Sequence, residues 1–399
     1  MKKMQFTTTI IFIFVSALTI IAFDVQATSN SSTSMIKPQG TIIPFDSDRW
    51  NFIGSTKLEN YMDQTSVNLG LKKDGKPLGF GVAMLKDSEF SEGIIEYDVV
   101  FDETRTFAGL RFHALKGPNF ENFYLRAHQS GNPDANQYMT VYNGVPSWQL
   151  YYGEQYSSPA KYVFNEWMHI KVVVSGKLAD IFIMDMQTPA LTVKLKRDEV
   201  TGKLGLWGLN LGGDVRFANF AVKKMKKPEI KGTPKPEIAA KPGTVLSWSV
   251  SNRFDWQSLT GKTTLTKKDK SNLKFRTLKS EMTGMTNLAQ LQGVEKGKNT
   301  VFAKVVITSK TDQIKKLAFG FSDDAKVYLN DQILFEGSDR YRSRDYRFLG
   351  TVGFYDAVYL PLQKGDNELL FAVTEDVGDV TGWAVQAKFE NMENISFDK

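Results

Sequence analysis

The chain has 399 residues, of which 42% are hydrophobic and 24% charged, a balance typical of globular proteins rather than of disordered or multi-span membrane chains. It contains no cysteine and only three histidines, which excludes disulfides, thiol nucleophiles and cysteine-ligated metal centres. The formal net charge is +6, from 50 basic and 44 acidic residues.

Residues 1–27 have the pattern of a secretory signal peptide. Lys2 and Lys3 precede an apolar run, and Val25-Gln26-Ala27 supplies a small-residue cleavage site. The pattern predicts an exported protein, periplasmic or secreted to the cell surface, without a membrane span after cleavage.

Residues 41–222 consist of short runs in which apolar and polar side chains alternate. In residues 93–101 the alternation places Ile95, Tyr97, Val99 and Phe101 on one face. Further runs with the same period occur at residues 108–114, 122–128, 138–142, 148–152, 168–174, 179–184, 204–207 and 215–222. Many short strands without a long helical period predict a sandwich of two sheets.

Five segments of this region resemble the concanavalin A-like lectin/glucanase sandwich, and most of all the laminin-G-like and 3-keto-disaccharide hydrolase-type domains of exported bacterial proteins. They are EGIIEYDVVF, FAGLRFHA, ENFYLRAH, EWMHIKVVVSGKLADIFI and GKLGLWGLNLGGDVRFANFAVK. The resemblance implies a fold and a carbohydrate-related role, because the shared pieces are mainly core strands.

Residues 223–243 are expected to form a linker rich in proline and lysine. The segment holds seven lysines and two glutamates, so most of the net positive charge of the chain is concentrated in it. Four prolines favour an extended, semi-rigid spacer between two independently folding parts. Since the excess charge lies in this spacer of an exported chain, nucleic acid is not an expected partner.

Residues 244–397 are predicted to form a second β domain. The pieces FGFSDDAKVYLN, LQKGDNELLFAV and GWAVQAKF resemble the galactose-binding-like jelly roll. The predicted fold class is therefore all-β, with two β-sandwich (jelly-roll) domains joined by the linker. No cofactor or metal site is expected, although Asp323 and Asp324 leave a structural calcium ion open.

A basic and aromatic cluster in the first domain is the main candidate binding site. If residues 108–114 and 122–128 pair as a hairpin, Arg111, His113, Tyr124, Arg126 and His128 share one face, with further aromatic residues close by in sequence. Arginine, histidine and aromatic side chains suit saccharides, and two arginines would suit a carboxylate or sulfate group. The candidate ligand-binding residues are Arg111, His113, Tyr124, Arg126, His128, Tyr138, Tyr142, Trp148 and Tyr151.

Two carboxylates on one strand form a second candidate site. Glu96 and Asp98 lie two residues apart and share a face, as the acid and nucleophile of a glycosidase would. The second glutamate of the related glucanases is missing after Asp98. His169 is expected to be a structural histidine with satisfied ring nitrogens.

Three functions remain open at this point. The leading hypothesis is an exported bacterial carbohydrate-binding protein that recognises a polysaccharide or oligosaccharide, an acidic one included. The alternatives are a polysaccharide-cleaving enzyme, using His113 or His128 as a lyase base or Glu96 and Asp98 as a hydrolase pair, and a cell-surface adhesion module.

Overall fold

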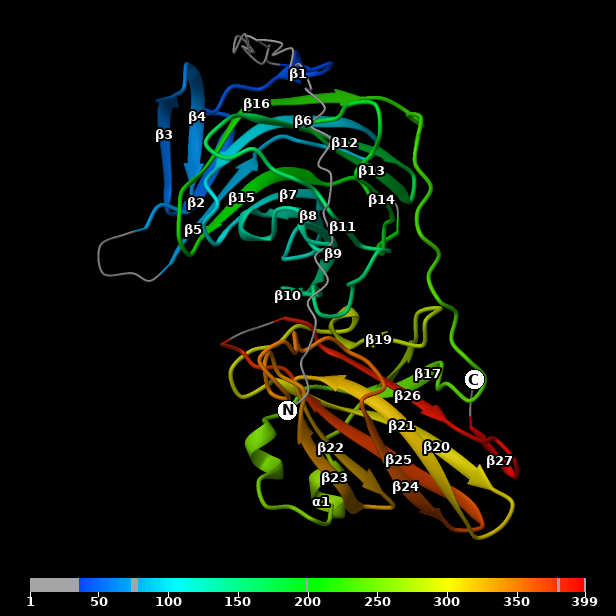
Figure 1. Cartoon of the computed structure of the whole chain (residues 1–399). Helices are drawn as coiled ribbons and strands as arrows, with labels where there is room; N and C mark the ends of the chain where they lie inside the picture. The colour runs from blue at the N-terminus through cyan, green and yellow to red at the C-terminus, as the bar shows by residue number, and fades with distance from the viewer. Residues whose placement is uncertain (1–35, 73–77, 199, 379–380, 398–399) are drawn as a thin grey trace, which may run out of the picture. The chain divides into compact units, whose positions relative to one another are not determined.

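The computed structural model describes residues 36–72, 78–198, 200–378 and 381–397, and from Lys37 onward the chain forms one compact unit. Almost all of its regular structure is β (Figure 1), which confirms the predicted fold class. The helical elements of the described residues are short: η1 (Ala127–Gln129), η2 (Trp256–Leu259), α1 (Lys267–Lys270) and η3 (Leu288–Gln290). The predicted signal peptide lies outside the described residues, and within them no helix is long and apolar enough to cross a membrane.

Strands β1 to β16 form a first sandwich of two eight-stranded antiparallel sheets. We call the first the back sheet; its order is β14 (Leu191–Lys194), β13 (Leu178–Ile183), β12 (Met168–Ser175), β6 (Gly93–Phe101), β16 (Val215–Lys224), β4 (Gln64–Leu69) and β3 (Thr56–Tyr61), with β1 (Thr41–Ile42) paired to β16. We call the second the front sheet; its order is β10 (Val145–Pro146), β9 (Asn136–Tyr142), β8 (Phe120–Arg126), β7 (Thr106–Ala114), β15 (Lys203–Asn210), β5 (Gly79–Leu85) and β2 (Trp50–Gly54), with β11 (Ser157–Ser158) paired to β9.

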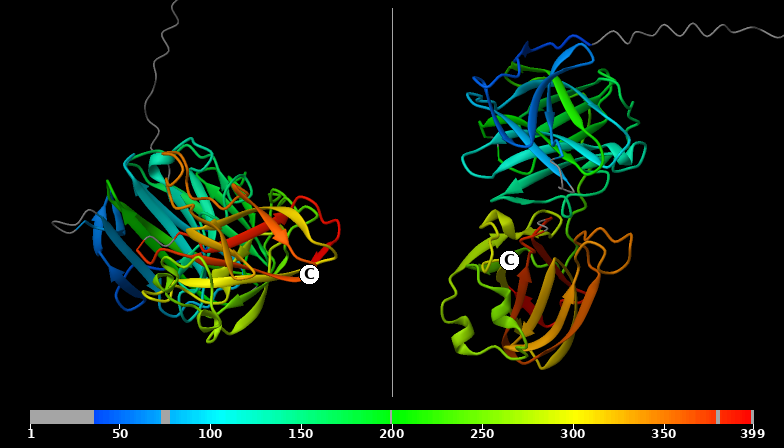
Figure 2. Two further views of the ribbon diagram at one scale, coloured as in Figure 1. Left: turned by 90° about the horizontal axis from the view of Figure 1, so that it is seen from below. Right: turned by 90° about the vertical axis from the view of Figure 1, so that its left-hand side faces the viewer.

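Strands β17 to β27 form a second sandwich, coloured yellow-green to red in Figure 2. Its seven-stranded sheet has the order β18 (Phe275–Lys279), β17 (Ser247–Ser251), β20 (Thr300–Ser309), β25 (Gly365–Thr374), β22 (Asp324–Leu329) and β23 (Gln332–Ser338), with β27 (Ile395–Phe397) paired to β20. Its four-stranded sheet has the order β19 (Thr286–Asn287), β26 (Ala384–Phe389), β21 (Gln313–Ser322) and β24 (Asp356–Leu362).

The core of the first sandwich lies between its two sheets, as the period-two patterns predict. The inward side chains of β6 are the four predicted ones, Ile95, Tyr97, Val99 and Phe101, and all belong to one buried cluster. That cluster also contains front-sheet residues such as Leu110 on β7. Because these inward positions are filled by apolar side chains, any ligand of the front sheet has to lie on its outer face.

The segment 223–243 contains no strand after β16 ends at Lys224, in keeping with its prolines. It is nevertheless tied to the first sandwich. The backbone N–H groups of Lys231 and Gly232 donate to a carboxylate oxygen of Asp180 at 2.6 and 3.2 Å, and Ile230 packs on the small cluster that includes Phe182. The predicted spacer is therefore an extended segment that runs along the protein surface.

Candidate functional site

The hairpin β7–β8 is present and brings the predicted basic residues to the front sheet. Its register pairs Gly109 with Tyr124 and Phe107 with Arg126, so Arg111, Tyr124 and Arg126 all belong to the outer face. The shared outer face of these three side chains is as predicted, and their binding of a ligand stays a prediction.

His113 is the exception, because β7 contains a β-bulge at this point. Gly205 of β15 pairs with Arg111, but Lys203 pairs with Ala114, so β7 has one extra residue, and the φ of His113 is 51°. The bulge breaks the alternation, and His113 is buried, with its Nε2 2.8 Å from the carbonyl oxygen of Ser91. The prediction that His113 joins the outer cluster, as ligand or base, is therefore wrong.

Trp207 lies on the outer face of β15 and was not among the site residues predicted from the sequence. Gly109 on the neighbouring strand makes room for it, since a Cβ on this glycine would overlap the indole ring. The indole Nε1 donates to Asn122 Oδ1 at 2.7 Å. A sequence signal existed: Leu204 and Leu206 point inward, which leaves Trp207 as a large aromatic residue on the opposite face of the strand.

Three cavities follow one another along the outer face of the front sheet, and we call them together the groove. Their volumes are about 330, 400 and 430 Å³. The first and second share Met139, Pro146 and Trp207, and the second and third share Arg126, Asp134, Trp148 and Leu349. The aromatic residues of the first sandwich that line the groove are Phe80, Phe107, Phe120, Tyr124, Trp148, Tyr152 and Trp207.

Arg111 lines one end of the groove, and its guanidinium is not neutralised by a carboxylate of the described residues. Its guanidinium carbon lies 4.5 Å from the ring centroid of Phe120 and 5.9 Å from that of Phe80. Burial lowers the pKa of Arg111 to about 10, so it remains protonated at neutral pH. Within the described residues it takes part in no ion pair, and its Nε has no hydrogen-bond partner. A planar cation of this kind can bind a carboxylate or sulfate with two parallel hydrogen bonds.

Arg126 is only 9% exposed and is held by neighbouring groups. It donates to the carbonyl oxygen of Asp134 at 2.8 Å, to the hydroxyl of Tyr124 at 2.7 Å and to Gln137 Oε1. Tyr124 in turn donates to Gln137 Oε1 at 2.7 Å. Arg126 therefore positions Tyr124 in the groove and has less donor capacity left for a ligand than Arg111.

His128 lies beside this network, in η1 directly after β8. It lines the central cavity together with Arg105, which is exposed. Its Nδ1 is buried without a hydrogen-bond partner among the described residues. Burial, together with the charges of Arg105 and Arg126, lowers the pKa of His128, so the imidazole is neutral at pH 7.

Tyr138, Tyr142 and Tyr151 lie in a different place from the predicted face. Tyr138 and Tyr151 are fully buried, and the hydroxyl of Tyr138 donates to Glu121 Oε2 at 2.7 Å. Tyr142 packs against the core of the second sandwich and donates to the carbonyl oxygen of Lys196 at 3.2 Å. The prediction that these three tyrosines bind the ligand needs correction, since each is engaged inside the protein. Only Trp148 of the four predicted aromatic residues after β8 lines the groove.

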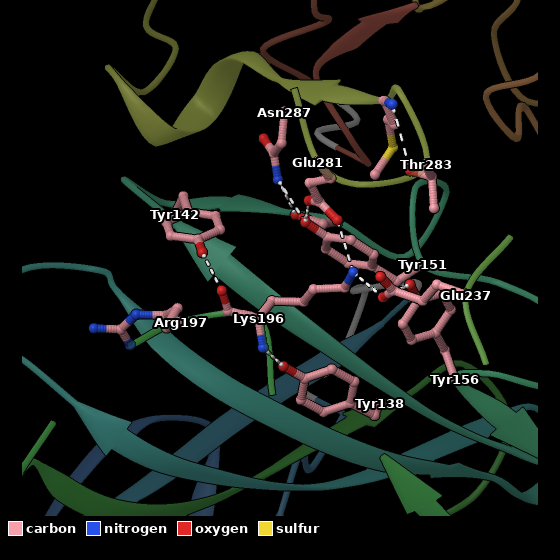
Figure 3. Close-up of polar contacts among 12 residues, drawn as sticks. Tyr138, Tyr142, Tyr151, Tyr156, Lys196, Arg197, Glu237, Glu281, Thr283 and Asn287 are labelled. Atoms are coloured by element: carbon pink, nitrogen blue, oxygen red, sulfur yellow. Dashed lines mark hydrogen bonds and ion pairs between the residues drawn. The ribbon is translucent and has the colours of Figure 1, made fainter. Parts of the chain in front are cut away.

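The buried tyrosines surround Lys196 (Figure 3), and we define the Lys196 cluster as Tyr138, Tyr151, Tyr156, Lys196, Glu237 and Glu281. Lys196 Nζ pairs with Glu237 of the linker segment and, at 2.7 Å, with Glu281 of the second sandwich. Burial alone would raise the pKa of Glu237, but hydrogen bonds from Lys196 and Tyr156 hold it below its usual value. The cluster therefore contributes contacts between the sandwiches and does not open onto the groove.

Glu96 and Asp98 lie on the back sheet, on the side of β6 that faces away from the core, where His169 on β12 stands beside them. His169 Nδ1 is 2.7 Å from Asp98 Oδ1 and its Nε2 is 3.4 Å from Glu96 Oε1. Burial by itself lowers the pKa of His169, but the two carboxylates raise it to about 9. All three are buried, and the backbone N–H of Gln39 covers Glu96 at 2.7 Å. Both nitrogens of His169 thus have partners, as expected, and the carboxylates are not solvent-facing.

Asp323 and Asp324 have protein partners. Asp324 pairs with Arg340 at 2.5 Å, and Asp323 accepts from the backbone N–H of Asp376 at 2.9 Å. Burial raises the pKa of Asp323 to about 6. In the part of the chain that the structure describes, no group of three or more histidine and acidic side chains is arranged to hold a metal ion.

No protein-family model and no curated protein matches this chain. Among solved structures, the carbohydrate-binding module CBM66 from Bacillus subtilis is similar at 16% identity and a TM-score of 0.34, covering 45% of this chain and 100% of its own. The Bacillus licheniformis beta-glucanase is similar at 9% identity and a TM-score of 0.34, covering 47% of this chain and 97% of its own. The exoplasmic/lumenal domain of VIP36, in a Ca²⁺/Man3GlcNAc-bound form, is similar at 12% identity and a TM-score of 0.36, covering 48% of this chain and 90% of its own.

Proposed function

We propose that this protein binds a glycan chain in the groove of the front sheet. The observation that carries the proposal is the succession of three connected cavities that share lining residues and contain aromatic rings along their whole length. A polymer of sugar rings needs an elongated surface of this kind, with flat apolar faces for the rings and a few polar groups for the hydroxyls.

The charge of the groove favours a glycan that carries carboxylate or sulfate groups. Arg111 at one end and Arg105 near the centre are cations without an ion-pair partner among the described residues. An anionic sugar would supply the missing partner, and the apolar rings beside Arg111 lower the competition from water. The signal-peptide pattern of residues 1–27 supports an exported bacterial protein that meets such a polymer in the periplasm or at the cell surface.

Affinity electrophoresis of the full chain tests this function with three probes: polygalacturonate, a sulfated glycan and a neutral β-glucan. We expect retardation by the anionic glycans. Arg111→Ala should weaken that binding by about 1.5–3 kcal/mol if the charge-assisted contacts are made. Arg49→Ala is the matched control, because Arg49 is 54% exposed and does not line the groove. Equal binding by wild type and Arg111→Ala would contradict the proposed role of the groove.

A second candidate function is cleavage of a polyuronate by elimination, favoured by the position of the neutral imidazole of His128 in the lining of the central cavity. In this reaction His128 removes the proton beside the uronate carboxylate, a carbon–carbon double bond forms, and the neighbouring glycosidic C–O bond breaks. The hydroxyl of Tyr124 already donates to Gln137 Oε1, so the leaving oxygen takes its proton from water. Growth of ultraviolet absorbance from the unsaturated product would support the lyase, and its loss in His128→Asn would assign the base. No absorbance change with any polyuronate would exclude this candidate.

A further inference from the structure

One loop of the second sandwich reaches the groove. We define the arginine loop as residues 339–355, between β23 and β24. Its Tyr341 and Leu349 line the central cavity of the groove, opposite first-sandwich residues such as Trp148. The ring centroids of Tyr341 and Trp148 are 6.4 Å apart, with their planes at 70°.

The loop is fixed to the first sandwich through Gln149, which is fully buried. Gln149 Nε2 donates to the carbonyl oxygen of Leu349 at 2.9 Å, and its Oε1 accepts from the hydroxyls of Ser322 and Thr381 at 3.1 and 2.6 Å. Because every polar atom of the Gln149 side chain has a partner, the loop cannot leave the groove without exposing buried polar groups.

The loop is fixed to its own sandwich by two arginines. Arg340 pairs with Asp324 and Asp376, each at 2.5 Å. Arg344 pairs with Asp339 at 2.5 Å and with Asp356. Each arginine thus pairs with two carboxylates, and such networks restrict loop motion more than isolated surface pairs do. The loop that carries Tyr341 is thus fixed both to the first sandwich and to its own sandwich.

We propose that the arginine loop forms one wall of the groove and that Tyr341 contacts the bound glycan as a stacking surface. This inference rests on the proposed function and adds the second sandwich to it. The binding unit is then the pair of sandwiches, and its ligand is an oligosaccharide long enough to pass from Arg111 to Trp148 and Tyr341. A mono- or disaccharide bound at Arg111 would not reach the loop.

The test is a calorimetric titration of the full chain with galacturonan oligomers of increasing length. Tyr341→Ala is compared with Tyr346→Ala, a tyrosine of the same loop that is 78% exposed and does not line the groove. We expect Tyr341→Ala to lower the affinity for long oligomers about threefold to tenfold, as for the loss of one aromatic contact. Short oligomers should bind Tyr341→Ala as they bind the wild type, and Tyr346→Ala should match the wild type throughout.

Three outcomes overturn the inference in distinguishable ways. If Arg111→Ala weakens binding but Tyr341→Ala does not, the groove binds glycan without the loop, and only the present inference fails. If Tyr346→Ala weakens binding as much as Tyr341→Ala, the effect belongs to the loop in general and not to the wall. If the wild type binds no oligomer of the series, the proposed function fails for this glycan class, and the inference fails with it.

Discussion

Arg126 lies on the outer face of the front sheet, as predicted for a ligand-binding residue, but its guanidinium is engaged by neighbouring protein groups. Its donors are directed to Asp134, Tyr124 and Gln137, and the side chain is almost completely buried. The sequence alone indicated a ligand-binding arginine. The contacts indicate instead that Arg126 stabilises the fold.

We therefore expect Arg126→Ala to lower the free energy of unfolding by about 1–3 kcal/mol, because it removes the donor to the buried hydroxyl oxygen of Tyr124 and one of the two donors to Gln137 Oε1. Urea denaturation of the full chain measures this value. Arg105→Ala is the control, since Arg105 is exposed in the same cavity and its removal should change stability by no more than about 0.5 kcal/mol. Equal stability of both variants would contradict the assigned role.

His169 gives a prediction on the dependence of stability on pH. Its pKa is about 9 in the folded state against an ordinary 6.5, so its contribution to stability is fully present below about pH 6.5 and is lost as the pH rises through 9. The free energy of unfolding of the wild type should therefore fall across this window. In His169→Gln the fall should be smaller.

Chemical denaturation at a series of pH values between 6 and about 9.5 measures the difference. His128→Gln is the control, because the pKa of His128 is lowered and this variant should keep the fall seen in the wild type. A pH dependence in His169→Gln that equals that of the wild type would show that the contact with Asp98 and Glu96 does not hold the proton.

Single strands of the first sandwich show where the sequence pattern predicts side-chain orientation correctly and where it does not. Strict alternation correctly assigned the inward face of β6 and the hairpin β7–β8, because both strands pair regularly in this region. It failed after Phe112, where one extra residue in β7 redirects His113. A bulge depends on the partner strand β15, which lies far away in the chain, so the pattern of β7 alone does not contain it.

The prediction that the tyrosines of β9 face outward was wrong for a related reason. Tyr138 pairs with Phe123, an inward residue, and its hydroxyl is satisfied by buried Glu121. A buried tyrosine with a hidden partner cannot be distinguished from an exposed one by its neighbours in sequence. Trp207, by contrast, was predictable, because the two leucines that precede it in the strand, Leu204 and Leu206, point inward and leave Trp207 on the opposite face.

At the scale of the whole molecule, the two sandwiches share more contacts than the linker composition suggests. Asn143 Nδ2 donates to the carbonyl oxygen of Ala289 at 2.8 Å, and Asn287 Nδ2 donates to Ser147 Oγ at 3.1 Å. The Lys196 cluster and Gln149 add further buried polar contacts. The linker composition predicted two independently folding parts, and the structure differs because the partners in these contacts are single polar residues far apart in the chain.

Limited trypsin digestion tests this arrangement. The lysines of residues 223–243 are exposed, so cleavage should occur in this segment and give two fragments on a denaturing gel. Because of the buried polar contacts, we expect the two fragments to elute together in native size-exclusion chromatography. Elution as two separate species immediately after cleavage would show that the sandwiches are independent, as the linker composition alone predicts.

The central claim is that a glycan chain lies on the outer face of the front sheet, and a crystal structure of the full chain with a bound anionic oligosaccharide tests it most directly. The predicted result is electron density for consecutive sugar rings along the groove, with an acidic group at Arg111 and a ring against Trp148 and Tyr341. Density for the oligosaccharide at the back sheet beside Glu96 and Asp98, or on the second sandwich away from the arginine loop, would contradict the claim.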